Sequence, residues 1–266
     1  MPAAGRRLDQ WLVAHGCAKT RSRARWLIES GYVYVRGQPC RKPSRLIPNL
    51  CQVEVYGAGL PYVSRGGLKL ERALQTFGAE VAGLVALDIG ASTGGFTDCL
   101  LQYGARRVYA LDVGIGQLAP RLGEDRRVIP LEGRNVRTFQ AAELPEAVDL
   151  ITVDVSFISL ALVLPLLPPF LRSRGRVVAL IKPQFEVGAQ HVGRGGIVRD
   201  PHCRELALRR IISTAEAIGF HVLGAVDAPR LHAHANQEFF IDLGWAAERA
   251  TIATGQQPIP ALDALI

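Results

Sequence analysis

Four charged residues lie at positions from which they could carry out acid–base or electrostatic chemistry. Asp154 and Lys182 each directly follow a short run of apolar residues, and Glu238 opens the last such run, residues 238–243. Lys69 precedes the first run of this kind. A buried lysine can accept a proton or stabilise a developing negative charge, and neighbouring carboxylates can hold it in place. These residues are therefore candidate catalytic groups, provided that the fold brings them together.

The apolar runs themselves indicate the fold. Residues 85–89, 108–112, 150–154 and 177–182 are almost wholly apolar, and each carries Asp or Lys at or next to its end. Such runs are typical of strands that are buried on both faces of a parallel sheet covered by helices. Ligands of these sheets bind at the edge where the carboxyl ends of the strands meet. We therefore expect an α/β fold with a Rossmann-like sheet.

The first run leads into a glycine-rich turn, residues 88–96, that opens a helix. Glycine lets the backbone approach a ligand closely, and Asp112, at the end of the next run, stands where an acid can bond ribose hydroxyls. Nicotinamide or flavin dinucleotides and S-adenosylmethionine (SAM) are both bound in this way, and a purely structural turn is a third interpretation. The turn lacks a strict GxGxxG pattern, which favours SAM. The expected cofactor-binding residues are Asp88, Gly90, Ala91, Ser92, Gly94, Gly95, Phe96, Asp112, Val113, Asn135 and Asp154.

The net charge of +7 is concentrated in the first quarter of the chain. Residues 1–60 contain ten Lys or Arg against three Asp or Glu, and the remaining residues contain 21 of each sign. The spacing of apolar residues predicts a helix over 6–15, a second between Thr20 and Gly31, and strands near 32–35 and 52–56. A small basic module usually meets nucleic-acid phosphate, although a solvated charged surface has the same composition. The candidate RNA-binding residues are Arg6, Lys19, Arg21, Arg23, Arg25, Arg36, Arg41, Lys42 and Arg65.

Both parts of the chain resemble known families. Two small helices with an arginine cluster, followed by a V-x-V-R-G turn, resemble the alpha-L RNA-binding motif, a small α+β domain. The remainder contains, in order, SRGGxKL, LDIGASTGGFTD, DVSFISL, IKPQFE and a late Glu. This pattern resembles the TlyA-type ribosomal RNA 2'-O-methyltransferases of the FtsJ-like (RrmJ-like) superfamily, whose signature is a Lys-Asp-Lys-Glu tetrad. The resemblance implies a class I SAM-dependent methyltransferase domain with four catalytic residues, Lys69, Asp154, Lys182 and Glu238.

The same resemblance implies an activity. The expected reaction is methylation of the 2'-hydroxyl of cytidines in 16S and 23S ribosomal RNA within ribosomal subunits, a modification linked to sensitivity to capreomycin-type antibiotics. The last strand of this family's sheet runs antiparallel, which would bring Glu238 to the same edge as Asp154 and Lys182. The expected domains are 1–59 for RNA binding, 60–64 as a linker and 65–266 for methyl transfer. Whether Lys182 is the general base or stabilises the alkoxide stays open.

Composition and cysteine usage narrow the alternatives. With 48% apolar and 21% charged residues the chain should be globular, and we expect a cytoplasmic monomer without a membrane-spanning segment. Five cysteines without a CxxC pair argue against a disulfide framework or a zinc site, and we do not expect His232 and His234 to bind metal. The rival hypotheses are a membrane-lytic haemolysin, an RNA-binding enzyme of another chemistry such as a pseudouridine synthase, and an RNA-binding scaffold with a vestigial methyltransferase fold.

Overall fold

In the computed structural model the chain divides into two units, Met1–Pro61 and Tyr62–Ile266. The predicted linker, 60–64, spans this division, and its Tyr62 is buried within the second unit. Lys19, the side chain of Arg23, and His232 with His234 lie outside the described residues. The structure describes residues 5–18, 20–29, 31–48, 51–55, 61–230 and 235–246.

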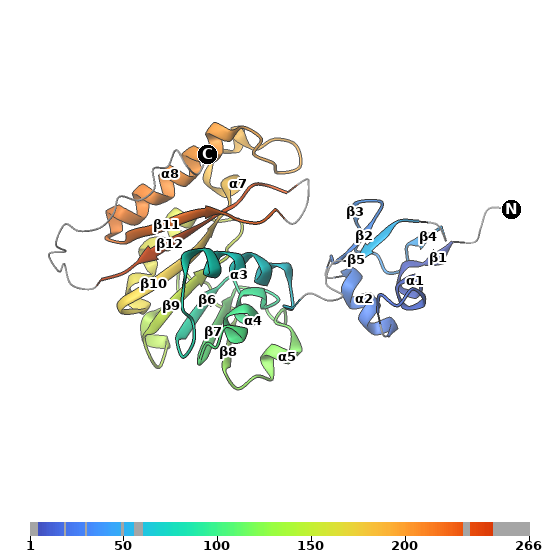
Figure 1. Ribbon diagram of the computed structural model, residues 1–266, viewed down its shortest axis with the longest axis horizontal. Coiled ribbons are helices and arrows are strands. Elements are labelled where there is room, and N and C mark those ends of the chain that lie inside the picture. Colours follow the sequence, from blue (N-terminus) through green and yellow to red (C-terminus); the bar gives the residue numbers. More distant parts are fainter. Residues whose placement is uncertain are drawn as a thin grey trace. The chain divides into compact units, whose positions relative to one another are not determined.

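The first unit combines two helices with short strands (Figure 1). Its elements are β1 (Arg6–Arg7), α1 (Leu8–Ala14), α2 (Arg21–Glu29), β2 (Val33–Val35), β3 (Gln38–Pro39), β4 (Leu46–Ile47) and β5 (Val53–Val55). Strand β2 pairs antiparallel with β3 and β5, and β1 pairs antiparallel with β4. The predicted apolar faces of the two helices are confirmed, because the side chains on them are buried together: Leu8, Trp11, Leu12, Ala24, Leu27 and Ile28.

The second unit is built on a seven-stranded sheet in the order β11-β12-β10-β9-β6-β7-β8 (Figure 1). The strands are β6 (Val85–Ile89), β7 (Arg107–Asp112), β8 (Val128–Glu132), β9 (Val148–Val153), β10 (Leu171–Ile181), β11 (His221–Asp227) and β12 (Phe239–Gly244). Neighbours from β10 to β8 pair in parallel, whereas β12 pairs antiparallel with both β10 and β11. The predicted α/β fold with a mostly parallel sheet is therefore confirmed.

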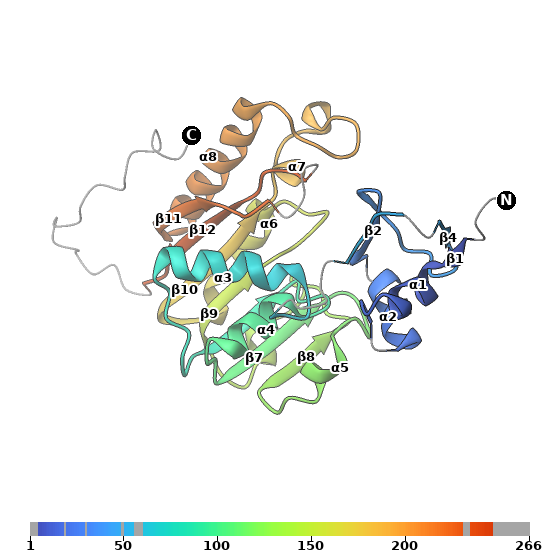
Figure 2. The same cartoon turned by 45° about the vertical axis from the view of Figure 1, so that its right-hand side comes forward.

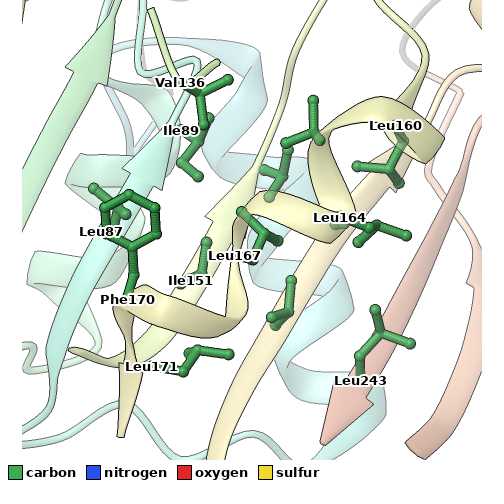
Figure 3. Close-up of a cluster of buried hydrophobic side chains, with 14 of the residues drawn as sticks. Leu87, Ile89, Val136, Ile151, Leu160, Leu164, Leu167, Phe170, Leu171 and Leu243 are labelled. Atoms are coloured by element: carbon green, nitrogen blue, oxygen red, sulfur yellow. The ribbon is translucent and has the colours of Figure 1, made fainter. Parts of the chain in front are cut away.

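Helices cover both faces of this sheet (Figure 2). On one face the core packs against α3 (Arg65–Phe77) and α4 (Gly95–Gln102), and on the other against α6 (Leu160–Val163) and α8 (Pro201–Ile218). Figure 3 shows part of the core on the face covered by α6 and α8, where side chains of β6 and β9 meet those of α6 and the turns that follow it. The shorter elements are α5 (Pro120–Gly123), α7 (Pro183–Glu186), and the 3-10 turns η1 (Ala141–Glu143), η2 (Leu164–Leu166), η3 (Pro168–Phe170) and η4 (Ala189–His191).

The register of β12 against β10 fixes which residues meet at the carboxyl edge of the sheet. Phe239 pairs with Ile181, so that Glu238 and Lys182 occupy the next position in register. Asp154 follows β9, and its N–H donates to the carbonyl of Ile89 in β6 (2.9 Å). All three charged residues therefore leave the sheet at one edge, as expected from the apolar runs for Asp154 and Lys182 and from the family resemblance for Glu238.

Glycines let α3 and α4 begin in close contact. A Cβ on Gly67, in the first turn of α3, would overlap the buried ring of Tyr62, and a Cβ on Gly95 would overlap Oγ of Ser64. The glycines of the SRGG and TGG segments thus serve helix packing. This packing also positions Lys69 in the second turn of α3.

Alanine at Gly67 should destabilise the second unit, although alanine normally stabilises a helix relative to glycine. We expect a loss of about 1–3 kcal/mol, because the added methyl group has no room beneath the Tyr62 ring. Gly123→Ala is the matched control, since a Cβ there meets nothing within 4 Å. Thermal melting of both variants checks the prediction, and a Gly67→Ala protein as stable as the control would contradict it.

Candidate functional site

Lys182 lies at the centre of the carboxyl edge. Its Nζ is 2.7 Å from Oδ1 of Asp154 and donates a hydrogen bond to Oγ of Ser156 (2.8 Å). The side chain of Lys182 is 13% exposed and that of Asp154 is 25% exposed. Oδ1 of Asp154 is buried, and apart from the charge of Lys182 it has no well-aligned hydrogen bond from the described residues. The pair is thus held by charge in a largely desolvated place.

Lys69 and Glu238 form the second ion pair of the edge, through Nζ and Oε2. Their side chains are 21% and 14% exposed. Glu238 directly precedes β12, and its backbone carbonyl accepts from the N–H of Ala228 (2.8 Å), which fixes the chain there. The structure therefore brings all four predicted catalytic residues to one edge, as two ion pairs.

A cleft of about 530 Å³ opens beside Asp154. Its walls come from the ends of β6 and β7 and from the segments that follow β6, β7, β8 and β9. Six of the predicted cofactor-binding residues line it: Gly90, Ser92, Asp112, Val113, Asn135 and Asp154. Asp112 is well oriented, because its carboxylate accepts from the N–H groups of Ser92 (2.8 Å) and Gly114 (2.7 Å).

The other five predicted cofactor residues, Asp88, Ala91, Gly94, Gly95 and Phe96, do not line this cleft. A Cβ on Gly94 would overlap the side chains of Leu118 and Leu122, so this glycine serves packing. Phe96 lies in the core with its ring 6.0 Å from that of Phe240.

Asp88 is fully buried beneath the glycine-rich turn. Its carboxylate accepts from Oγ1 of Thr97 (2.7 Å) and Oγ1 of Thr152 (3.0 Å). Burial raises the pKa of Asp88 to about 7, against the opposing effect of these hydrogen bonds. In this structure Asp88 therefore ties the turn to β9 and α4.

Sequence reasoning missed several residues of the cleft, among them Gln117, Arg137 and Phe157. They lie in irregular segments, where no periodicity marks a residue's direction. Phe157 is the most unusual, because its side chain is 92% exposed and its backbone has a φ of +65°. Its ring lies 5.3 Å from that of Phe185. Its exposure and its positive φ make Phe157 a candidate functional residue, since neither is explained by packing.

Glu132 does not line the cleft but holds in place the loop after β7, which does. Its carboxylate accepts from the N–H groups of Gly116, Gln117 and Leu118 at 2.9, 3.2 and 3.4 Å. These backbone hydrogen bonds hold the pKa of Glu132 below its usual range. The side chain of Gln117 in turn accepts from Oγ of Ser92 (3.1 Å). This network fixes the loop after β7 against the glycine-rich turn.

In the first unit, Asp9 organises part of the arginine cluster. Asp9 is completely buried and accepts hydrogen bonds from Arg7 (3.0 Å, two bonds) and from Nε of Arg21 (3.1 Å). The hydrogen bonds from Arg7, and then the Arg21 guanidinium, hold the pKa of Asp9 below its usual range. Arg21 is therefore part of the fold of this unit as well as a candidate RNA contact.

The remaining candidate RNA-binding residues differ in whether their side chains already contact other groups of the protein. Arg25 lies 3.7 Å from Glu29, and Arg41 donates to the carbonyl of that residue (3.4 Å). Arg65 belongs to the second unit, where it begins α3. Among these candidates, Arg6, Arg36 and Lys42 have exposed side chains that make no ion pair or hydrogen bond with the described part of the chain.

Comparison with known proteins gives these two units their families. Residues 62–245 match the model of the FtsJ-like methyltransferases, and residues 6–48 match the S4 domain. The chain belongs to the FtsJ-like methyltransferase family. It is therefore a methyltransferase that carries an S4 domain at its N-terminal end.

Relatives share both parts of the chain. The protein is 42% identical to the 16S/23S rRNA (cytidine-2'-O)-methyltransferase TlyA of Mycobacterium tuberculosis, over 94% of this chain and 93% of that one. It is 40% identical to Hemolysin A of Brachyspira hyodysenteriae, over 88% and 97% of the two chains. The solved structure of a Streptococcus thermophilus protein named as a hemolysin is 40% identical with a TM-score of 0.72, and covers 92% of this chain and 90% of that one.

These relatives carry two kinds of name, one for a methyltransferase and one for a lytic protein. The family match confirms the methyltransferase prediction and gives no support to a pseudouridine synthase. Across the described residues, no helix combines the length and the apolar character needed to span a membrane.

Removing Arg21 should have two effects that the removal of free cations does not. Arg21→Ala leaves buried Asp9 with fewer partners, so we expect a loss of about 1–2 kcal/mol of stability along with weaker RNA binding.

The double variant Arg6→Ala/Lys42→Ala should keep the parental melting temperature. Its RNA affinity should depend less on salt, by roughly 0.7–0.9 in the log–log slope for each phosphate that is no longer bound. Filter binding at several salt concentrations, with melting on the same samples, tests both expectations. Unchanged melting in Arg21→Ala would contradict the structural role.

Proposed function

We propose that the protein transfers a methyl group from SAM to the 2'-hydroxyl of cytidine in ribosomal RNA. The arrangement of Lys182 with Asp154 and Ser156, next to the cleft and to the Lys69–Glu238 pair, is the observation that carries this proposal. The choice of cytidine in ribosomal RNA rests on the name of the Mycobacterium tuberculosis relative. Ribosomes are the substrate in this proposal, so we place the activity in the cytoplasm. One chain should suffice, because the cleft and all four charged residues belong to one chain.

The cleft fits SAM in size and in its polar groups. Its volume of about 530 Å³ is in the range of small-molecule sites. The Asp112 carboxylate, held by two backbone N–H groups, keeps lone pairs that can accept from ribose hydroxyls. Val113, which is 68% exposed, offers an apolar surface to a flat base, and the Asn135 amide stands on the same wall. When bound, SAM supplies an electrophilic methyl group.

Lys182 is the residue that would act on the 2'-hydroxyl. An ammonium group has three N–H donors; in this structure one points to Ser156 and another lies against Asp154, so a third can reach an incoming oxygen. A ribose hydroxyl attacks only if its proton is removed or its developing charge is stabilised. Either role requires Nζ of Lys182 within hydrogen-bond reach of the 2'-oxygen. The Lys69–Glu238 ion pair holds in place the side chain of Glu238, which lies opposite Lys182 in the register of the sheet.

Alanine at Lys182 should abolish most of the chemistry while leaving the fold intact. We expect transfer to fall about 10²-fold or more, the usual scale for a lost acid–base or electrostatic group. Lys182→Arg should not restore activity, because a guanidinium keeps its proton and its planar fork has a different shape from the ammonium that contacts Asp154 and Ser156. The measurement is transfer of labelled methyl from SAM to ribosomal subunits, followed by mapping of the modified nucleotides.

Melting and SAM binding of the same preparations provide the control, since Lys182 does not line the cleft. Transfer near the parental level in Lys182→Ala would overturn the mechanism. Methyl groups found on bases, or on the 2'-hydroxyl of another nucleoside, would overturn the proposed reaction or its cytidine specificity.

The exposed ring of Phe157 predicts a contact with RNA. Aromatic side chains give bases a surface for stacking, worth about 1–3 kcal/mol per base. Phe157→Ala should therefore raise KM for ribosomal subunits about 5- to 150-fold. Melting should not fall, because a 92% exposed side chain contributes little to the core. Phe157→Trp keeps a stacking surface and should retain most of the activity. Steady-state kinetics on the two variants tests this, and equal KM values for Phe157→Ala and the parent would contradict it.

A further inference from the structure

A well-ordered turn follows the Lys182 segment and has no part in the site described so far. Residues 193–197 form it, in the stretch that joins α7 to α8 (Figure 1). The N–H of Gly193 donates to the carbonyl of Ile197 (3.0 Å), and the N–H of Gly196 donates back to the carbonyl of Gly193 (3.0 Å). Gly195 and Gly196 both have φ near +80°, a conformation that glycine adopts readily. The backbone of this turn is therefore closed on itself, with Arg194 near its tip.

The side chain of Asn236 fastens this turn to the catalytic edge. Its Nδ2 donates to the carbonyl of Gly196 (2.8 Å), and its Oδ1 accepts from the N–H of Val198 (2.8 Å). Asn236 precedes Glu238 by two residues, so their Cα atoms are at most roughly 7 Å apart. The turn is thus held at the end of β12 where Glu238 lies, just beyond the carboxyl edge of the sheet.

The turn and the cofactor cleft lie on opposite sides of the Lys182–Asp154 pair. The cleft is built on the ends of β6 and β7 and on the segments that follow β9 and β8, whereas the turn is attached to segments next to β10 and β12. Lys182 and Asp154 stand at the boundary between β10 and β9. A cofactor in the cleft would therefore approach the pair from one side and leave the other side to the substrate.

The turn and the residues just after it carry exposed arginines on that side. Arg194 and Arg199 are exposed, and neither guanidinium has an ion-pair or hydrogen-bond partner among the described residues. In the same unit Arg121, Arg172 and Arg176 are all paired with carboxylates. The acid next to Arg199 is Asp200, which is engaged in capping α8 through the N–H of His202 (2.9 Å).

We propose that this turn, together with the residues that join it to α8, is a second RNA-binding surface, at which Arg194 and Arg199 bind backbone phosphates next to the target nucleotide. The inference rests on the proposed function, because the partner is the ribosomal RNA strand that carries the target ribose. A ribose that reaches Lys182 brings its flanking phosphates past the β10–β12 side of the edge. Guanidinium forks pair with phosphate in two parallel hydrogen bonds, and a fixed turn lowers the entropic cost of forming them.

This surface adds a task that the S4 domain by itself does not perform. The S4 domain carries the excess positive charge of the chain and supplies general affinity for RNA. The turn acts within the catalytic unit and so sets how the target strand lies across the edge. Its contribution should appear in KM for RNA and in the salt dependence of binding, and not in SAM binding.

The test compares two double variants of the full chain. Arg194→Ala/Arg199→Ala removes the proposed phosphate-binding side chains. The control, Arg126→Ala/Arg174→Gly, removes two exposed arginines that likewise have no partner among the described residues but lie near the amino ends of β8 and β10. Glycine is chosen at position 174 because the φ of Arg174 is +69°. Arg194→Lys/Arg199→Lys keeps the charges and should restore most of the affinity.

Methyl transfer to ribosomal subunits is measured against subunit concentration at 50 and 200 mM salt, with SAM binding and melting on the same samples. Without the two guanidinium–phosphate pairs, KM should rise about tenfold or more at low salt and the salt slope should fall by roughly 1.4–1.8, with kcat near parental. The control should behave as the parent. If the parent methylates ribosomal RNA and the two double variants have the same KM and salt slope, the proposal for the turn is wrong. If the parent transfers no methyl to ribosomal RNA, the proposed function fails and the inference fails with it.

Discussion

The antiparallel pairing of β12 with β10 brings residues from distant parts of the chain to one edge of the sheet. Asp154 and Lys182 reach this edge because both follow strands that end there. Glu238 precedes its strand, so it reaches the same edge only because β12 runs the other way, and there it meets Lys69 of α3. Because side chains alternate between the two faces, a register slip of one residue would turn Glu238 to the opposite face. The anchor at Asn236 depends on the same pairing, since it lies on the same segment.

Much of this edge could be predicted from the sequence, for a physical reason. An apolar run without polar interruption has to be buried on both faces of a sheet, so the charged residue after it must leave the sheet at the carboxyl end. This argument alone places Asp112, Asp154 and Lys182. It could not place Lys69 or Glu238, because neither follows a strand. Their positions came from the family resemblance, and the structure explains them by the reversal of β12 and the packing of α3.

The rest could not be predicted because it depends on contacts between segments far apart in the sequence. The sequence pattern predicts that the glycine-rich turn binds a cofactor, yet Gly94 and Gly95 face the side chains of Leu118 and Ser64. A glycine that admits a ligand and a glycine that admits another helix look identical in a sequence. Similarly, the RSRAR cluster shows only positive charge, and nothing in it reveals that Arg21 holds the buried carboxylate of Asp9.

The choice of lysine over arginine is itself informative about the site. The chain has 31 basic residues, of which only four are lysines, and Lys69 and Lys182 are the two that occur after residue 61. Elsewhere in this unit arginine provides the positive charge, as in the pair of Arg176 with buried Asp242. A guanidinium is broad, planar and permanently protonated, whereas an ammonium is a compact donor that can give up its proton. In a unit with such a strong preference for arginine, the two lysines mark positions that suit a small or titratable cation. Both lysines of this unit fall in the two ion pairs of the edge, which supports, independently of any motif, the proposal that the chemistry takes place there.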